Sequence, residues 1–93
     1  MGTFVTIHRA PGLSAEEITA NAPAVIENKY ASFRQMYANL IAGFIVSIYE
    51  ADDRAAVERE FERIGFPFTE MHEVQFAGDA EQLAAMVTSG SAS

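Results

Sequence analysis

The chain has 93 residues, a length that corresponds to one domain, and 49% of them are hydrophobic, as in ordinary globular proteins. Thirteen acidic against six basic residues give a net charge of −7, which opposes binding to the phosphate backbone of a nucleic acid. The absence of cysteine excludes disulfides, thiolate nucleophiles and cysteine-ligated metal sites, and no apolar stretch is long enough to span a membrane.

The N-terminal part of the chain predicts a strand followed by a helix. Phe4–Arg9 is rich in residues that favour strands, alternates apolar with polar side chains and is ended by Pro11-Gly12. Ser14 and Glu17 have the spacing of a capping box, so we expect a helix to begin there. Pro23 lacks a backbone donor and is expected to bend or interrupt this helix. The apolar residues at helical spacing are Ile18, Ala22, Val25 and Ile26.

Two β-prone runs, Phe33–Ala38 and Phe44–Tyr49, predict the next strands. The segment between them, Asn39–Gly43, has the length of a hairpin connection and contains Asn and Gly, which tolerate positive φ. Leu40 and Ile41 lie at this turn, and an exposed apolar pair there indicates contact with something apolar. A lid over a pocket and a contact with a second subunit both explain it.

A second helix and a fourth strand complete the domain. Asp52 or Asp53 can cap the helix, and Gly65 is a typical C-terminal residue. The apolar face of this helix holds Val57, Phe61 and Ile64. The charged residues from Arg54 to Arg63 predict a solvated helix surface without a functional role. Glu70–Phe76 then predicts the fourth strand.

The predicted order, β-α-β-β-α-β, is that of an α+β, ferredoxin-like domain with a four-stranded antiparallel sheet and two helices on one face. We expect this domain over residues 1–77, a short C-terminal helical extension over 78–87, and a disordered tail over 88–93. The apolar stripe of the extension is suited to cover the domain's own sheet or a partner subunit. It consists of Leu83, Met86 and Val87.

Strand alternation divides the sheet residues into two sets. The more apolar set is expected to face the helices and contains Val5, Ile7, Met36, Ala38, Phe44, Val46, Ile48, Val74 and Phe76. The other set is expected on the open face and contains Thr6, His8, Gln35, Tyr37, Ile45, Ser47, Tyr49, Met71 and Glu73. A histidine, two tyrosines, a glutamine and a glutamate on one face are typical of a small-molecule site, and equally of a dimer interface.

The chain also resembles a known family in four motifs. They are Ile7–Arg9, Phe33–Tyr37, Val46–Glu50 and Glu60–Pro67. The family consists of small bacterial ferredoxin-like proteins, long classed as a domain of unknown function, that include nickel-binding members. The resemblance covers about Phe4 to Val74 and implies the ferredoxin-like fold and dimerisation.

The positions that depart from the family motifs are potential metal ligands. Gln35 stands where the family has histidine, Ser47 where it has cysteine, and Phe61 and Phe66 where it has two more histidines. His8 remains. Because nickel prefers imidazole and thiolate donors, the resemblance implies a metal site that has been dismantled and replaced by an apolar pocket or interface.

These observations lead to a first hypothesis of a homodimer or higher homo-oligomer, formed through the open sheet face, that binds a small apolar ligand around His8. A catalytic version needs no cofactor and performs acid/base chemistry such as isomerisation, cyclisation or dehydration. His8 is then the acid or base, Tyr37 and Tyr49 are donors and Glu73 orients the imidazole. The ligand-binding residues would be Thr6, Gln35, Ser47, Phe61, Phe66 and Met71.

Two alternatives remain open. One is a weak nickel or transition-metal binder that uses His8 with Glu73, His72 or Glu50. The other is a structural or regulatory interaction module. In each case we expect no nucleic acid and no membrane as partner, and the lack of a signal-peptide pattern favours the cytoplasm.

Overall fold

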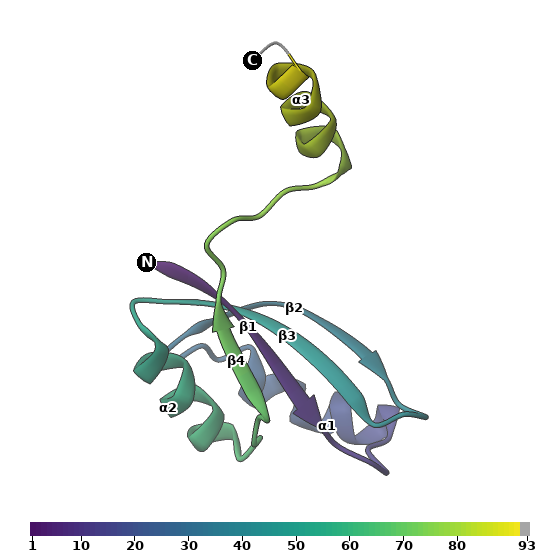
Figure 1. The fold of residues 1–93 in the computed structure, drawn as a ribbon. Helices are drawn as coiled ribbons and strands as arrows, with labels where there is room; N and C mark the ends of the chain where they lie inside the picture. The colour runs from purple at the N-terminus through teal and green to yellow at the C-terminus, as the bar shows by residue number, and fades with distance from the viewer. Residues whose placement is uncertain (92–93) are drawn as a thin grey trace.

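The computed structural model describes residues 1–91 and has the ferredoxin-like order predicted from the sequence. The four strands form one antiparallel sheet in the order β2-β3-β1-β4, so β1 lies between β3 and β4. Helices α1 and α2 lie on one side of this sheet, and the other face is open (Figure 1). The elements are β1 (Gly2–Arg9), α1 (Ala15–Val25), β2 (Ser32–Asn39), β3 (Phe44–Ala51), α2 (Arg54–Ile64), β4 (Glu70–Glu73) and α3 (Ala80–Ser91).

The helix ends follow the local sequence signals. The Ser14 hydroxyl accepts a hydrogen bond from the Glu17 backbone N–H at 3.1 Å, and the Glu17 carboxylate accepts one from the Ser14 N–H at 3.3 Å. Asp53 caps α2, and Gly65 ends it at φ 69°. Pro23 lies within the last turn of α1, which continues to Val25. A missing donor so close to a helix end disrupts little of the hydrogen-bond ladder.

The C-terminal elements differ from expectation in their bounds. β4 ends at Glu73, so Val74–Phe76 does not continue the strand. α3 runs from Ala80 to Ser91 and therefore includes positions 88–91, which we expected to be disordered. Residues 92–93 of the expected tail lie outside the described residues. Among the described residues, no helix is long and apolar enough to cross a membrane.

The predicted faces of β1, β3 and β4 are reversed in the structure. Thr6, His8, Ser47 and Tyr49 are buried beneath the helices, as are Phe4, Ile45 and Met71. Val5, Ile7, Val46 and Ile48, predicted to face the helices, alternate with these residues and lie on the open face. Strand β2 follows the prediction, because a register shift between Phe33 and Gln35 changes its alternation relative to β3.

The reversal is possible because the polar residues on the buried face satisfy one another while aromatic rings cover them. The core combines Phe4, Tyr49 and Met71 from the sheet with Val57 and Phe61 from α2. No buried side-chain nitrogen or oxygen of the described residues lacks a hydrogen-bond partner. The desolvation penalty that normally keeps polar groups out of a core is therefore largely offset here.

Candidate functional site

Most of the predicted site residues come together, but inside the core rather than on the open face. Thr6, His8, Ser47, Tyr49 and Met71 project from the helix-facing side of β1, β3 and β4, and all are at most 4% exposed. Phe61 of α2 and Phe66, just after that helix, cover His8. The cluster is an interior packing unit without direct access for a substrate.

The imidazole of His8 uses both of its nitrogens. Nδ1 lies 2.9 Å from the Pro67 carbonyl oxygen, which can only accept, so Nδ1 carries the proton in neutral His8. Nε2 lies 2.9 Å from the Thr6 hydroxyl oxygen and therefore accepts a hydrogen bond from that hydroxyl. The same hydroxyl lies 3.3 Å from the Ser47 carbonyl oxygen. The local network thus leaves no imidazole nitrogen for a ligand.

Aromatic packing encloses the same ring. Phe66 stacks on His8 with centroids 4.1 Å apart and an interplanar angle of 7°. Phe61 meets it edge-on at 4.8 Å. Burial lowers the pKa of His8 and outweighs the hydrogen bond to Pro67, which acts in the opposite direction. His8 is therefore a neutral structural residue in the folded state.

Tyr49 is equally unsuited to proton transfer. Its ring packs edge-on against Phe61 at 4.9 Å and against Phe33 at 5.6 Å. Burial, with a further contribution from the negative charge of Glu60, raises the pKa of Tyr49 to about 12. The phenol thus stays protonated at neutral pH.

The remaining predicted site residues lie elsewhere. Gln35 and Tyr37 pair with Ile48 and Val46 and so share the open face, where Tyr37 is 57% exposed. Glu73 is exposed at the end of β4, opposite Phe4. The structure therefore does not bring the proposed orienting carboxylate, or one of the two proposed phenols, to His8.

A buried ion pair was missed by the sequence prediction, which treated this helix surface as solvated. The Glu60 side chain is fully buried and is bound by the Arg63 guanidinium and by the Tyr30 N–H, the latter at 2.8 Å. Arg63 also donates to the Ala24 carbonyl at 2.7 Å. Burial alone would raise the pKa of Glu60, but the hydrogen bonds and charge of Arg63, with backbone donors, lower it. The pair ties α2 to α1 and to the segment before β2.

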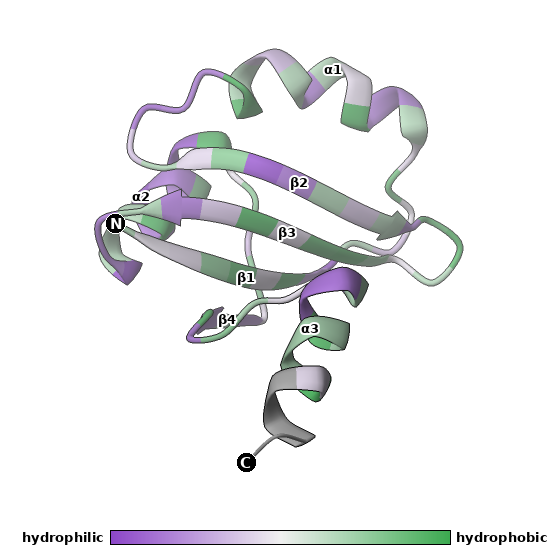
Figure 2. Cartoon of the chain, turned by 90° about the horizontal axis from the view of Figure 1, so that it is seen from above, coloured by the Kyte–Doolittle hydropathy of each residue, from purple (hydrophilic) through white to green (hydrophobic). Residues whose placement is uncertain are grey.

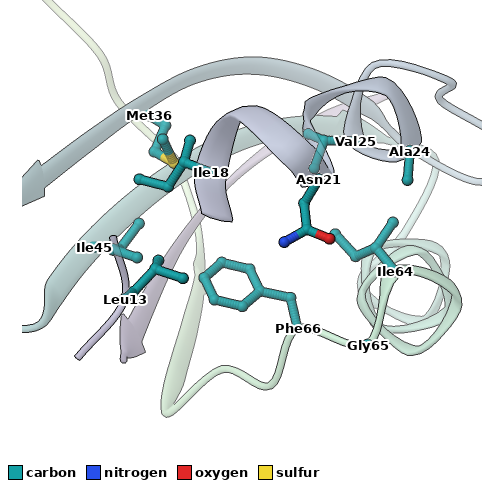
Figure 3. A pocket seen from close by; sticks show the side chains of 10 residues that line it. All are labelled: Leu13, Ile18, Asn21, Ala24, Val25, Met36, Ile45, Ile64, Gly65 and Phe66. Carbon is teal, nitrogen blue, oxygen red and sulfur yellow. The ribbon is translucent and has the colours of Figure 1, made fainter. Parts of the chain in front are cut away.

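An apolar cavity lies between α1, the sheet and the end of α2 (Figure 3). Its volume is about 180 Å³. The residues that line it are Leu13, Ile18, Asn21, Ala24, Val25, Met36, Ile45, Ile64, Gly65 and Phe66. Phe66 lines the cavity and also stacks on His8, which is not among the lining residues. The Leu40–Ile41 turn does not contribute to this lining.

The cavity exists because α1 packs loosely. None of the residues of α1 is buried, and Figure 2 shows the helix along the β2 edge rather than under the central strands. The Asn21 side chain reaches from α1 toward Phe66 and Ile64 (Figure 3). Its amide N–H donates to the Glu17 carbonyl at 2.9 Å, so the amide oxygen remains for a ligand. No sequence signal located this space, since it depends on the distance between a helix and a sheet.

Comparison with known proteins now connects this architecture to a family. The family model "Nickel responsive protein SCO4226-like" matches residues 4–74. The chain belongs to this family. The crystal structure of SCO4226 from Streptomyces coelicolor A3(2) matches with a TM-score of 0.71 and 28% identity, over 82% of this chain and 99% of that one. No curated protein matches the chain. The family resemblance and the fold predicted from the sequence are confirmed.

The residues around His8 do not fit the nickel that the family description implies. Both imidazole nitrogens are engaged, Phe61 and Phe66 surround the ring with hydrocarbon, and Gln35 lies on the other sheet face. Nickel prefers imidazole and thiolate donors, and a site needs several of them. The described part of the chain contains no group of three or more His, Cys, Asp or Glu side chains able to hold a metal ion.

Proposed function

We propose that this family member is a small-molecule-binding domain whose ligand occupies the cavity beneath α1. The observation that carries the proposal is an apolar space of about 180 Å³ with a single amide at its edge. A cavity of about 150 Å³ lined by Leu, Ile and Phe is enough to hold benzene. The matching ligand is a largely apolar molecule the size of benzene or phenol, with one hydrogen-bond donor for Asn21.

Binding without catalysis fits this lining best. None of the residues that line the cavity has an ionisable side chain, so the site supplies neither a general acid nor a general base. His8, the predicted acid or base, is stacked on Phe66, is not among the lining residues, and has both nitrogens occupied. A cytoplasmic location stays a prediction.

Titration with phenol and benzene, followed by methyl NMR, tests the proposal. We expect saturable shifts of the Met36 and Ile64 methyl groups, with a dissociation constant on the order of 0.1–1 mM for such small ligands. Ala24→Phe fills the cavity and should abolish the shifts, whereas Ala20→Phe, on the exposed side of α1, should leave them intact. Equal binding by the two variants, with both folded by circular dichroism, would contradict the proposal.

Asn21 provides a sharper test of ligand class. One net hydrogen bond is worth about 1 kcal/mol, so the wild-type chain should bind phenol about fivefold more tightly than benzene. Asn21→Leu should remove this preference while benzene binding remains. A preference for phenol that persists in the variant would assign the hydrogen bond to another group.

A second candidate function, favoured by the family membership, is weak binding of nickel or a related ion. His72 and Glu70 form an exposed pair on β4, with Nε2 and Oε1 3.2 Å apart, and so provide one imidazole and one carboxylate. Nickel titration by calorimetry distinguishes the sites: His72→Gln should abolish any binding, and His8→Gln should not. Loss of binding in His8→Gln alone would instead assign the metal site to His8 in the core.

A further inference from the structure

Helix α3 is an addition to the family domain. The family model ends at residue 74, and 82% of this chain already covers 99% of SCO4226. The linker from Val74 to Asp79 and α3 therefore have almost no counterpart in that structure. Figures 1 and 2 show α3 apart from the sheet, on the side opposite α1 and α2.

The local sequence provides an N-terminal cap for α3 but is not sufficient to make the isolated helix stable. The Gln82 N–H donates to the Asp79 carboxylate at 2.7 Å, and the Asp79 N–H donates to the Gln82 side chain at 2.9 Å, which is a reciprocal cap. With 12 residues, however, α3 is near the length at which an isolated helix is only marginally stable in water. It therefore needs a surface to pack against.

Its own apolar stripe shows what kind of surface is needed. Leu83 and Met86 are each 48% exposed and Val87 is 72% exposed, all on one side of the helix. The open face of the sheet is the corresponding uncovered surface, with half-buried aliphatic side chains on its two central strands. They are Val5 and Ile7 of β1 and Val46 and Ile48 of β3.

Charge is complementary between the same two surfaces. Asp79 and Glu81 lie at the start of α3, and the helix has no basic residue. Arg9, at the end of β1, lies over the Phe44 ring at 4.8 Å and has no ion-pair partner in the described part of the chain. An acidic helix end placed beside Arg9 would supply one.

The path of the linker favours a second copy over the chain's own sheet. Val74 is held to the Thr3 carbonyl at 2.7 Å, at the end of β1 opposite Arg9. Thr3 and Arg9 are about 20 Å apart along a strand, and the linker reaches at most about 20 Å when fully extended. Asp79 would reach Arg9 of its own chain only if the linker were fully stretched along the sheet. In the structure the linker instead runs away from the sheet (Figure 1).

We propose that α3 docks on the open sheet face of a second copy of this chain, and that the second copy returns the same contact. The stripe of Leu83, Met86 and Val87 covers the aliphatic residues of β1 and β3, and the acidic start of α3 lies near Arg9 of the second copy. Such a reciprocal exchange forms a closed dimer with twofold symmetry. It leaves the cavity beneath α1 untouched, so it is independent of the proposed ligand.

Matched charge substitutions in the full chain test the exchange by sedimentation equilibrium. We expect a concentration-dependent dimer, and Met86→Asp should raise its dissociation constant at least about tenfold, because a charge would be buried without a partner. Ala85→Asp adds the same charge on the opposite side of α3 and should change the constant by less than about twofold, although it costs more helix propensity.

A mixed sample of isotope-labelled and unlabelled chains identifies the docking partner. We expect intermolecular nuclear Overhauser effects between the methyl groups of Leu83 or Met86 and those of Val46 or Ile48. A chain that stays monomeric up to about 0.5 mM, contacts found only within one chain, or equal effects of Met86→Asp and Ala85→Asp would each overturn the proposal.

Discussion

At the scale of single residues, His8 shows how a polar side chain can belong to a core. Its ring lies between Phe61 and Phe66, and its two nitrogens meet Thr6 and the Pro67 carbonyl. The neutral form is therefore fully satisfied, and burial lowers the pKa of the imidazole below its usual value near 6.5. Proton binding and folding are coupled at this residue.

The sign of this coupling predicts acid destabilisation. In the unfolded chain His8 gains a proton near pH 6.5, whereas the folded chain resists it to lower pH, so the unfolded state binds more protons in this range. The contribution of neutral His8 to the unfolding free energy is complete above pH 6.5. It falls as the pH decreases, by at most about 1.4 kcal/mol per pH unit. Urea unfolding between pH 7.5 and about pH 5 measures it.

The two histidines of the chain provide matched variants for this experiment. His8→Phe should flatten the pH dependence of the unfolding free energy in this range, and His72→Gln, at an exposed position, should keep the wild-type slope. The same slope in His8→Phe and in wild type would show that other groups cause the acid sensitivity.

At the scale of elements, the Glu60–Arg63 pair determines how the helices and the connection before β2 are held together. Glu60 accepts from the Tyr30 N–H and from Arg63, and Arg63 continues to the Ala24 carbonyl at the end of α1. If the Glu60–Arg63 pair were removed, α1 would have few other contacts to hold it in place, because none of its residues is buried. Arg63, paired with Glu60 and also with Glu27 at 3.3 Å, thus fixes one end of α1, while the middle of the helix remains above the cavity.

Removal of the Glu60 charge should therefore be costly. Glu60→Gln leaves Arg63 without its buried counter-charge, and breaking such pairs typically costs about 3 kcal/mol. Glu58→Gln removes an exposed i,i+4 partner of Arg54 and should cost less than about 0.5 kcal/mol. Urea unfolding at pH 7 compares the two. Similar losses in both variants would mean that Glu60 is not the tie between these elements.

At the scale of the whole molecule, the chain consists of a sheet with two helices on one side and of α3, which lies outside these two layers. α2 packs against the sheet through Val57 and Phe61, whereas α1 lies along the β2 edge with no buried residue. The opposite sheet face and α3 both expose aliphatic side chains. For a domain of this size the core is sufficient but not large. Further burial is available at the open face.

We therefore expect the family domain to fold without α3. A chain ended after residue 77 should keep its sheet signal in circular dichroism and, at low concentration, unfold within about 3 °C of the full chain. A chain ended after Thr69 loses β4 and the buried Met71 and should not fold. A fall of about 10 °C or more in the first case would place α3 in the core of its own chain.

Much of the fold follows from short-range signals in the sequence. The Ser14–Glu17 capping box, an aspartate cap at position 52 or 53 and the glycine at position 65 each depend on neighbours within a few residues. The structure confirms all three and has Asp53 as the cap. The motifs from Phe4 to Val74 likewise indicated the family that the comparison with known proteins confirms. Local chemistry and motif spacing were sufficient for both results.

The sequence by itself determined the order of the elements, their caps and the family, because these depend on interactions between near neighbours along the chain. Only the tertiary structure decided which sheet face meets the helices. Alternation separates two sets of side chains, but both sets contain enough apolar residues to serve as a core. The choice rests on partners distant in sequence, such as Thr6 with Ser47 and His8 with Pro67, which remove the cost of burying the polar set. The cavity beneath α1 depends in the same way on how far a helix stands from a sheet.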